Sequence, residues 1–321
     1  MRTDPRKIVF SFDSIDNMTQ QRTIPLVDTH AHINLEDFAP DLESLVARSR
    51  RGVMPEIKGR DLNDPLFRPF VAGVVCPAVD LQTSLRALEL ARRYPFVFAA
   101  CGVHPNHVAI LNEGEWDEIK RLIRNEVRET PENRRLVALG ETGLDRYWDD
   151  SPFDDQLRFF LETIELSQEL NLPIIIHSRV ANDDLDAVIC DRYPLASPSN
   201  PPVGVVHSFS GTPEQAARWL DRGFCLGFGG FVTYENKKFA PIWETAKLTP
   251  DDRFLLETDC PFLTPHPLRG KLERNEPLAT AFVAKRLATL RDASVEEIAR
   301  LALQNARRLF RLPELPTEPD E

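Results

Sequence analysis

Eight short apolar runs, each followed by a longer segment with apolar residues at helical spacing, constrain the fold of this chain most strongly. Such runs predict strands buried on both faces, as in a parallel sheet covered by helices. Because eight strand–helix units close into a barrel, we predict a single-domain α/β protein with a (β/α)₈ barrel. An open, doubly wound sheet is the alternative. The predicted strands are residues 26–30, 71–76, 96–101, 136–140, 173–177, 203–207, 224–228 and 254–258.

Helix-start signals fall where this alternation expects helices. Thr212 precedes proline and glutamine as an N-cap, and Ser294 opens a capping box. The C-terminal part predicts two further helices, residues 278–290 and 295–310, whereas residues 239–247 carry the weakest helical pattern.

We expect one barrel domain of residues 24–311, with a short segment before it and another after it. Residues 1–23 are polar and mixed in charge, which predicts a flexible N-terminal extension. Residues 312–321 are rich in proline and acidic side chains, so we expect a disordered tail. Two irregular stretches, 52–70 and 194–202, precede predicted strands and are interpreted as solvated connectors opposite the barrel mouth.

Composition limits the binding partners and the cellular compartment that we expect for this protein. A formal net charge of -11 and a pI near 5.3 argue against nucleic-acid binding through a broad basic surface, so contacts with a polyanion should be local. The five cysteines include no Cys-x-x-Cys pair and lie mostly in or beside apolar runs, which predicts buried thiols in the reducing cytoplasm. Because no apolar stretch reaches the roughly 18 residues of a membrane span, we expect no membrane partner.

Side chains that bind metals or move protons stand at the ends of the predicted strands. His30 and His32 end the first run, and strand residues two positions apart face the same side. In a barrel the carboxyl ends of all strands meet at one mouth, so four of the seven histidines would converge there with acidic residues. The candidate metal ligands are His30, His32, Glu141, His177, His207 and Asp259.

This set of ligands predicts two divalent metal ions per chain. Four imidazoles and two carboxylates are too many for one tetrahedral ion, but they suffice for two cations with positions left open for water and substrate. Mixed nitrogen and oxygen ligation suits Zn²⁺, Mn²⁺ or Co²⁺ and is compatible with Mg²⁺, so the metal is not chosen. The competing interpretation is a group of core histidines satisfied by backbone carbonyls.

Seven motifs in a fixed order make the chain resemble the TatD family of metal-dependent deoxyribonucleases, within the amidohydrolase-like TIM barrels. The motifs are Asp28-Thr29-His30-Ala31-His32, Gly102-Val103-His104-Pro105, Gly140-Glu141-Thr142-Gly143-Leu144-Asp145, His177-Ser178-Arg179, His207-Ser208-Phe209-Ser210-Gly211, Glu257-Thr258-Asp259-Cys260-Pro261, and Arg269-Gly270-Lys271 with Arg274-Asn275-Glu276-Pro277. The resemblance implies a TIM barrel whose two-metal site has Glu141 as the bridge, with His30, His32 and Asp259 on one cation and His177 and His207 on the other.

Two acidic residues are candidates for catalytic roles beside Glu141. Asp259 is the expected general base, because a carboxylate next to an activated water can take its proton. Glu257, two residues earlier, should face the same way and support a ligand. The alternative for Glu257 is a strand-end acid paired with a nearby arginine.

Contacts with substrate are assigned to His104 and to cations near the mouth. Arg179 presents a planar fork to phosphoryl oxygens, although a salt bridge to Asp145 or Glu141 is the alternative. His104 stands at a strand end and would contact phosphate or assist the leaving group, with a structural hydrogen bond as the alternative. The connection after the last strand adds three cations for which solvated surface charges are the alternative, namely Arg269, Lys271 and Arg274.

Two histidines are expected to lie outside the site, and two other loop residues depart from the family pattern. His107 and His266 are expected on the surface or in loops. Asn106 stands where the family often has a second histidine, and Val180 stands where an acid usually follows. These departures concern substrate preference, because none of them touches a predicted ligand.

The leading functional hypothesis is a metal-dependent hydrolase, most simply a 3′-5′ exodeoxyribonuclease acting on single-stranded DNA or frayed ends. The second is a hydrolase of carboxylic esters, lactones or amides, such as an aminoacyl-ester deacylase, because the same two-metal barrel attacks carbonyl carbon. A barrel kept as an interaction module is the third, and the intact ligand set argues against it. The sequence indicates no particular protein partner.

Overall fold

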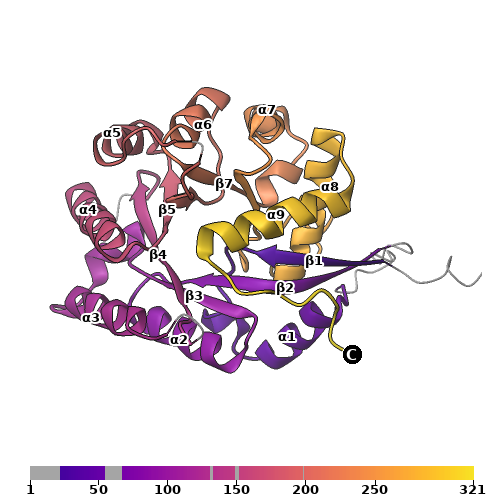
Figure 1. The fold of residues 1–321 in the computed structure, drawn as a ribbon, viewed down its shortest axis with the longest axis horizontal. Coiled ribbons are helices and arrows are strands. Elements are labelled where there is room, and N and C mark those ends of the chain that lie inside the picture. Colours follow the sequence, from indigo (N-terminus) through magenta and orange to yellow (C-terminus); the bar gives the residue numbers. More distant parts are fainter. Residues whose placement is uncertain (1–21, 55–66, 131–132, 149–151, 198) are drawn as a thin grey trace, which may run out of the picture.

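The computed structural model describes residues 22–54, 67–130, 133–148, 152–197 and 199–321 (Figure 1). Most of the predicted N-terminal extension therefore lies outside the described residues, and so do residues 55–66 of the predicted connector. The first strand, β1, spans Arg22–Asp28. Its first two residues had been assigned to the extension, but they belong to the sheet.

Eight parallel strands form one sheet in the order β1 to β8. The sheet closes into a barrel because the Thr29 N–H donates to the Leu256 carbonyl at 3.0 Å and the Asp259 N–H donates to the His30 carbonyl at 2.8 Å. This closure confirms the predicted barrel and excludes the open sheet. The strands are β1 (Arg22–Asp28), β2 (Phe67–Pro77), β3 (Val97–Cys101), β4 (Leu136–Asp145), β5 (Ile174–Arg179), β6 (Gly204–Val206), β7 (Phe224–Phe228) and β8 (Phe254–Leu256).

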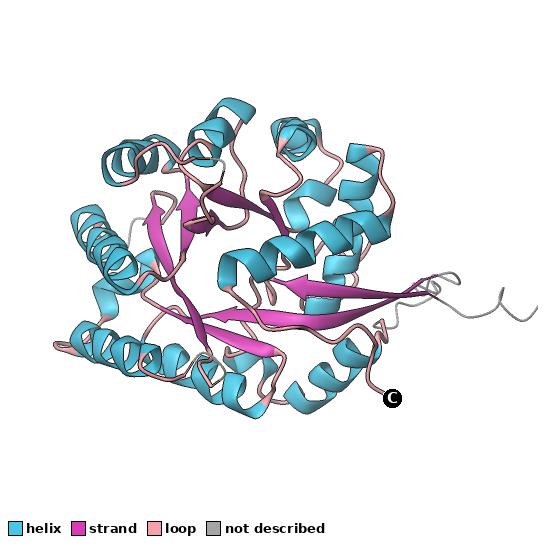
Figure 2. Cartoon of the chain, in the orientation of Figure 1, coloured by secondary structure: helices cyan, strands magenta, loops and turns pink. Residues whose placement is uncertain are grey.

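Helices follow the strands and surround the barrel (Figure 2). The α-helices are α1 (Leu42–Arg51), α2 (Leu81–Arg93), α3 (Glu115–Val127), α4 (Phe153–Leu170), α5 (Asn182–Arg192), α6 (Pro213–Leu220), α7 (Ala240–Leu248), α8 (Thr280–Arg291) and α9 (Val295–Phe310). Short 3₁₀ helices lie in the connections, namely η3 (Glu36–Phe38), η4 (Pro105–Ile110), η5 (Gly230–Thr233), η6 (Lys237–Phe239) and η7 (Pro277–Ala279). Among the helices described, none is both long enough and apolar enough to span a membrane.

The predicted helix starts are confirmed. The Thr212 side chain accepts a hydrogen bond from the Gln215 N–H and caps α6, and the Ser294 side chain accepts from the Glu297 N–H and caps α9. Helix α9 has the predicted bounds, and the weakly patterned segment forms α7 one residue further along the chain.

Two strand ends differ from the prediction in ways that shape the site. Strand β1 stops before His30 and His32, which lie on an irregular segment bonded to the chain after β8. Strand β4 instead continues past the predicted end at residue 140 and carries Glu141 and Asp145, with a register shift against β5. Acidic side chains of β4 therefore reach the mouth from within a strand.

Apolar side chains fill the molecule in two layers. One layer lies between the strands and the helices and contains large buried rings such as Phe160 of α4 and Trp219 of α6. The other fills the barrel interior with residues from every strand: Val27, Phe70, Ala72, Val75, Phe98, Ala100, Val137, Ala138, Ile175, Val205, Cys225 and Leu255. Helix α9 crosses the barrel in Figure 1 and packs against this interior layer through Leu309 and Phe310. The interior is thus a filled core closed at one end.

The C-terminal tail lies against the same end, so the expectation of a disordered tail is wrong. Leu312 and Leu315 are buried in the interior layer. The guanidinium of Arg50 bonds to Asp320, and the Thr23 hydroxyl donates to Glu318 at 3.2 Å. The acidic composition predicted solvation, but two leucines and these polar contacts hold the segment on the barrel.

Four of the five cysteines are buried as expected, whereas Cys190 is exposed on α5. Burial raises the pKa of Cys76, Cys101 and Cys225 to about 12. These buried thiols therefore stay protonated at neutral pH and are poor nucleophiles.

Removing a tail anchor should destabilise the barrel. We expect Leu315→Ala to lower the free energy of unfolding by about 2 kcal/mol, because it leaves a cavity against the interior layer. Leu195→Ala is the matched control, since the Leu195 side chain is 72% exposed and its loss should change little. Urea denaturation of both variants measures the difference. Equal midpoints would mean that the tail does not contribute to the core.

Candidate metal centre

The carboxyl ends of the strands open into a pocket of about 850 Å³, which is within the range of small-ligand sites. Residues from the connections after several strands line it, and all six predicted ligands lie at its floor or directly beneath it. Of these, His32, Glu141, His177, His207 and Asp259 line the pocket, and His30 lies fully buried behind them. The convergence expected from strand ends is therefore present in the structure.

Glu141 lies at the centre of the cluster and divides it into two halves. Its Oε2 atom is 3.2 Å from His30 Nε2 and 3.4 Å from His32 Nε2. Its Oε1 atom is 2.8 Å from His177 Nδ1 and 2.7 Å from His207 Nε2. One carboxylate oxygen thus faces each histidine pair, which is the arrangement that a bridging ligand requires.

The first half of the cluster adds a second carboxylate. The Nε2 atoms of His30 and His32 are 3.1 Å apart, and Asp259 Oδ1 lies 3.7 Å and 3.4 Å from them. His30, His32 and Glu141 form a group that could hold a metal ion, and Asp259 Oδ1 lies beside both of these histidines. That geometry suits a divalent cation with mixed ligation.

The second half contains three histidines, one more than predicted. His177 Nδ1 lies 3.3 Å from His207 Nε2. His104 Nε2, which was assigned to substrate, lies 3.3 Å from His177 Nδ1 and 3.7 Å from Glu141 Oε1. His104, Glu141 and His177 thus form a group that could hold a metal ion. The structure brings His104 closer to the ligands than its position in the sequence indicated.

Hydrogen bonds behind the cluster fix which ring nitrogens face inward. His32 Nδ1 lies 3.2 Å from the Pro77 carbonyl, which leaves Nε2 for the cluster. His177 Nε2 lies 3.1 Å from Asp145 Oδ2, which leaves Nδ1 for the cluster. The sequence names Asp145 only as an alternative partner of Arg179 and does not predict its contact with His177. The available signal for this contact was the position of Asp145 on β4, four residues after Glu141.

Glu257 supports the cluster from behind His207. It is almost fully buried, its Oε1 accepts a hydrogen bond from the Ser208 N–H, and the same oxygen lies 3.8 Å from His207 Nδ1. In the part of the chain that the structure describes, Glu257 has the Ser208 N–H and not an arginine as its partner, unlike the alternative expected from the sequence. Gly227 makes room for this side chain, because a Cβ there would lie 2.1 Å from Glu257 Oε2.

Asp28 joins the chain segments that carry the first histidine pair and Asp259. Its Oδ1 accepts the N–H groups of His30 at 3.2 Å and Thr258 at 3.0 Å, and its Oδ2 accepts the Thr258 hydroxyl at 2.6 Å. Asp28 is fully buried, and burial raises its pKa well above the usual range. This contact closes the barrel directly beside the ligands.

The electrostatics of the cluster fit bound cations. Three pairs of ring nitrogens face each other, one at 3.1 Å and two at 3.3 Å, and such lone pairs repel unless a proton or a cation lies between them. Burial lowers the pKa of His30 to about 4, whereas hydrogen bonds with Asp259 and Glu141 overcome burial and raise the pKa of His32 to about 10. Neighbouring imidazoles likewise overcome burial and hold the pKa of Glu141 well below its usual range. The residues present therefore include groups that could hold metal ions.

The predicted phosphate contacts after β8 do not gather at the pocket. Arg274 bonds to Asp41 and does not line the pocket, so the structure gives it an ion pair in place of both the predicted substrate contact and the alternative of a solvated surface charge. Arg269 lies over the ring of Tyr234 at 4.1 Å, and neither Arg269 nor Lys271 is among the residues lining the pocket.

Two other cations do line the pocket. Arg179 lies at its rim as predicted, and its guanidinium stacks on the ring of Tyr147 at 3.8 Å instead of pairing with the nearby acids. Lys238, which sequence reasoning missed, is the second. His107 was expected on the surface, yet it also lines the pocket and its Nδ1 lies 3.1 Å from Asp80 Oδ2.

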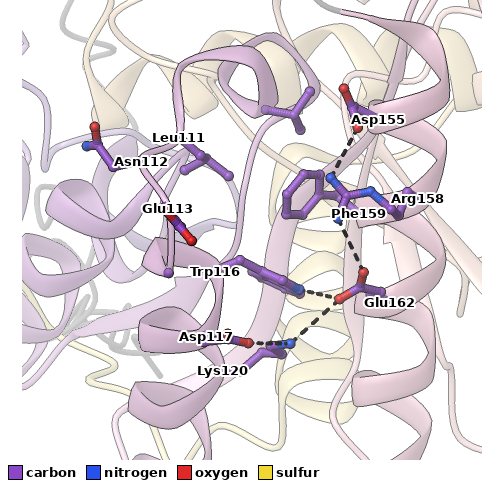
Figure 3. A pocket seen from close by; sticks show the side chains of 12 residues that line it. Leu111, Asn112, Glu113, Trp116, Asp117, Lys120, Asp155, Arg158, Phe159 and Glu162 are labelled. Atoms are coloured by element: carbon purple, nitrogen blue, oxygen red, sulfur yellow. Dashed lines mark hydrogen bonds and ion pairs between the residues drawn. The ribbon is translucent and has the colours of Figure 1, made fainter.

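A second hollow of about 490 Å³ lies between α3, α4 and the end of η4 (Figure 3). Both of its lining cations pair with acidic side chains: Lys120 lies 2.8 Å from Asp117 and 3.7 Å from Glu162, and Arg158 lies 3.1 Å from Asp155. The residues that line this hollow include none of the predicted site residues. The chemistry is therefore assigned to the pocket at the strand ends.

Comparisons with known proteins identify relatives of this chain. The uncharacterized metal-dependent hydrolase YabD of Bacillus subtilis (strain 168) is 39% identical over 287 residues, which cover 89% of this chain and 99% of the relative. The 3′-5′ ssDNA/RNA exonuclease TatD of Pantoea ananatis (strain LMG 20103) is 30% identical over 290 residues, covering 89% of this chain and 100% of the relative. The crystal structure of YjjV, a TatD homolog from Escherichia coli K12, superposes with a TM-score of 0.74 at 29% identity, covering 90% of this chain and 98% of that one. The sequence profile described as TatD related DNase matches residues 27–311, and this chain therefore belongs to the TatD related DNase family.

Proposed function

We propose that this protein is a two-metal hydrolase that removes nucleotides from the 3′ end of single-stranded nucleic acid, with DNA as the first substrate to test. The observation that carries the proposal is the position of Glu141, whose two oxygens face two separate histidine groups within 3.4 Å. Relatives named metal-dependent hydrolase and 3′-5′ ssDNA/RNA exonuclease support it.

The proposed ligands divide at Glu141. His30, His32 and Asp259 hold one cation, and His177 and His207 hold the other, with His104 as an additional ligand candidate. Zn²⁺, Mn²⁺, Co²⁺ and Mg²⁺ are all compatible with this set. Two ions bound there would polarise a phosphoryl oxygen and lower the pKa of a water molecule toward neutrality.

The protein's own side chains supply the remaining steps. Asp259 accepts the proton of the attacking water, since its side chain is 14% exposed and is the most accessible carboxylate of the cluster. Asp145 holds His177 in place through the contact at His177 Nε2, and Glu257 lies behind His207 at 3.8 Å from its Nδ1. Arg179 binds the phosphate next to the scissile bond.

Hydrolysis of an ester, lactone or amide remains the competing function, because the cluster would serve it equally well. The pocket favours a phosphodiester through its two lining cations, Arg179 and Lys238, in a chain of net charge -11. A neutral ester, lactone or amide has no negative group for these cations to hold.

Loss of the bridge should remove metal as well as activity. We expect wild type to bind two divalent ions per chain and Glu141→Ala to lose at least one of them, with hydrolysis reduced by roughly 10³-fold or more. Excess chelator should abolish hydrolysis by wild type. Metal content by mass spectrometry of the elements, together with a DNA hydrolysis assay, measures both effects. Two tightly bound ions in Glu141→Ala would contradict the bridging role.

Metal binding should release protons at neutral pH. Hydrogen bonds and charges from the acidic ligands raise the pKa of His32 to about 10 and that of His207 to about 9, so both rings hold protons until a cation displaces them. Metal affinity should therefore rise with pH up to about 9, by roughly tenfold per pH unit for each proton displaced. Titration calorimetry at pH 7.5 in two buffers of different ionisation enthalpy counts the protons. Identical heats in both buffers would contradict this prediction.

A phosphodiester substrate should make turnover sensitive to Arg179 and mildly sensitive to salt. We expect Arg179→Ala to lower kcat/KM on single-stranded DNA and to reduce the slope against log salt by about 0.7, the value for one lost phosphate contact. Arg269→Ala is the matched control, because Arg269 does not line the pocket. Activity of wild type on esters or lactones but on no nucleic acid would favour the competing function.

A further inference from the structure

Aromatic side chains stand exposed around the mouth of the pocket. Among the described residues, Tyr147, Trp148 and Phe262 are the aromatic residues with strongly exposed side chains, at 54%, 50% and 54%. Trp148 and Phe262 line the pocket, and Tyr147 lies beside Trp148. Exposed apolar side chains that gather around a pocket are typical of a surface that binds a ligand.

Trp148, Tyr147 and Arg179 form one platform at this rim. The two rings meet edge to face with centroids 4.9 Å apart. The Arg179 guanidinium lies 3.8 Å from the centroid of the Tyr147 ring and 5.6 Å from that of the Trp148 ring. The Tyr147 N–H donates to Asp145 Oδ1 at 2.7 Å, while the other oxygen of Asp145 holds His177. The platform is thus fixed to the same carboxylate that orients a proposed metal ligand.

Phe262 stands over the other half of the cluster. Its ring lies 6.3 Å from that of His32, and its N–H donates to the Asp259 carbonyl at 2.8 Å. The Phe262 carbonyl accepts from the side chain of the fully buried Asn275 at 2.8 Å. These contacts fix the backbone of Phe262 next to the cluster while its ring stays open to the pocket.

The two aromatic groups lie on opposite sides of the mouth. Trp148 follows β4 and Phe262 follows β8, and these strands are four positions apart in a closed ring of eight. A ligand that contacts both groups must therefore pass over the proposed metal centre. Planar rings on both sides with a guanidinium beside one of them match the chemistry of nucleotides, which carry flat bases joined by anionic phosphates.

We propose that Trp148, with Tyr147 and Arg179, and Phe262 are two base-stacking subsites that hold the nucleobases on either side of the scissile phosphate. This inference rests on the proposed function and gives it a physical basis for selecting single strands. Only an unpaired, unstacked base exposes its face to a side chain, and stacking tolerates any base because every base has an aromatic face. Trp148 and Phe262 are accordingly positioning residues that act mainly on KM.

Abasic oligonucleotides test this inference directly. The substrate is a 5′-labelled single-stranded DNA that carries either normal nucleotides or one abasic site at the terminal or the penultimate 3′ position. We expect removal of a stacked base to lower kcat/KM of wild type by about tenfold, mostly through KM. On the normal strand, Trp148→Ala and Phe262→Ala should each have a kcat/KM about tenfold below that of wild type. On a strand that lacks the base stacked on the mutated residue, the kcat/KM of each variant should fall little further, because the contact is already lost.

Two further measurements separate stacking from a general structural defect. Trp148→Phe keeps a flat ring and should retain most of the activity that Trp148→Ala loses. A thymidine dinucleotide should quench the tryptophan fluorescence of wild type but not that of Trp148→Phe, whose remaining tryptophans, Trp116, Trp219 and Trp243, do not line the pocket. Unchanged fluorescence in wild type would overturn the inference without reference to turnover.

The outcomes also distinguish this inference from the proposed function. Stacking would be overturned, and the nuclease proposal left intact, by hydrolysis of DNA at equal rates with and without the bases. The same conclusion would follow if the loss caused by the substitution and the loss caused by removing the base were additive. Failure of wild type to hydrolyse any single strand with the four candidate metals would overturn the nuclease proposal and the stacking subsites together. Hydrolysis of apolar esters that depends on Trp148 would assign the rings to an acyl group instead.

Discussion

The carboxylate of Glu141 is the group on which the site depends, because it is almost fully buried between histidines from distant parts of the chain. A charge in such a place is costly unless cations or protonated groups surround it. His30 and His177 stand next to different oxygens of this carboxylate, so Glu141 joins the two halves of the cluster. The histidine pairs therefore depend on one another, and a change at Glu141 reaches all of them.

The barrel separates the groups that provide stability from those that provide chemistry. At one end, Phe310 and Leu315 close an interior filled by apolar side chains. At the other end the structure keeps less favourable features, such as Asp259 in the left-handed region with a φ of 55°. A non-glycine residue in that region costs on the order of 1 kcal/mol or more, and it persists where the surroundings hold it. The packed end provides the stability that such a site requires.

The sequence alone predicted the barrel and the convergence of the ligand candidates, since apolar runs mark strand ends and strand ends meet at one mouth. It could not show the partners of side chains on loops. Arg274 was expected at the substrate, but it pairs with Asp41, a residue 233 positions earlier in the chain. Likewise, an acidic composition concealed that Leu312 and Leu315 meet the interior. Long-range contacts of this kind leave no periodic pattern in the sequence.

Net charge makes short-range contacts decisive for a nucleic-acid substrate. A protein of formal charge -11 repels a polyanion at a distance, so binding must come from groups that act only after the strand has reached the pocket. The proposed stacking on Trp148 or Phe262 would be such a contact, because salt hardly screens it, while Arg179 would add one local cation. A paired duplex offers neither exposed base faces nor a shape that enters a pocket of about 850 Å³. Selection of free single-stranded ends would thus follow from the acidic surface and the aromatic rim together.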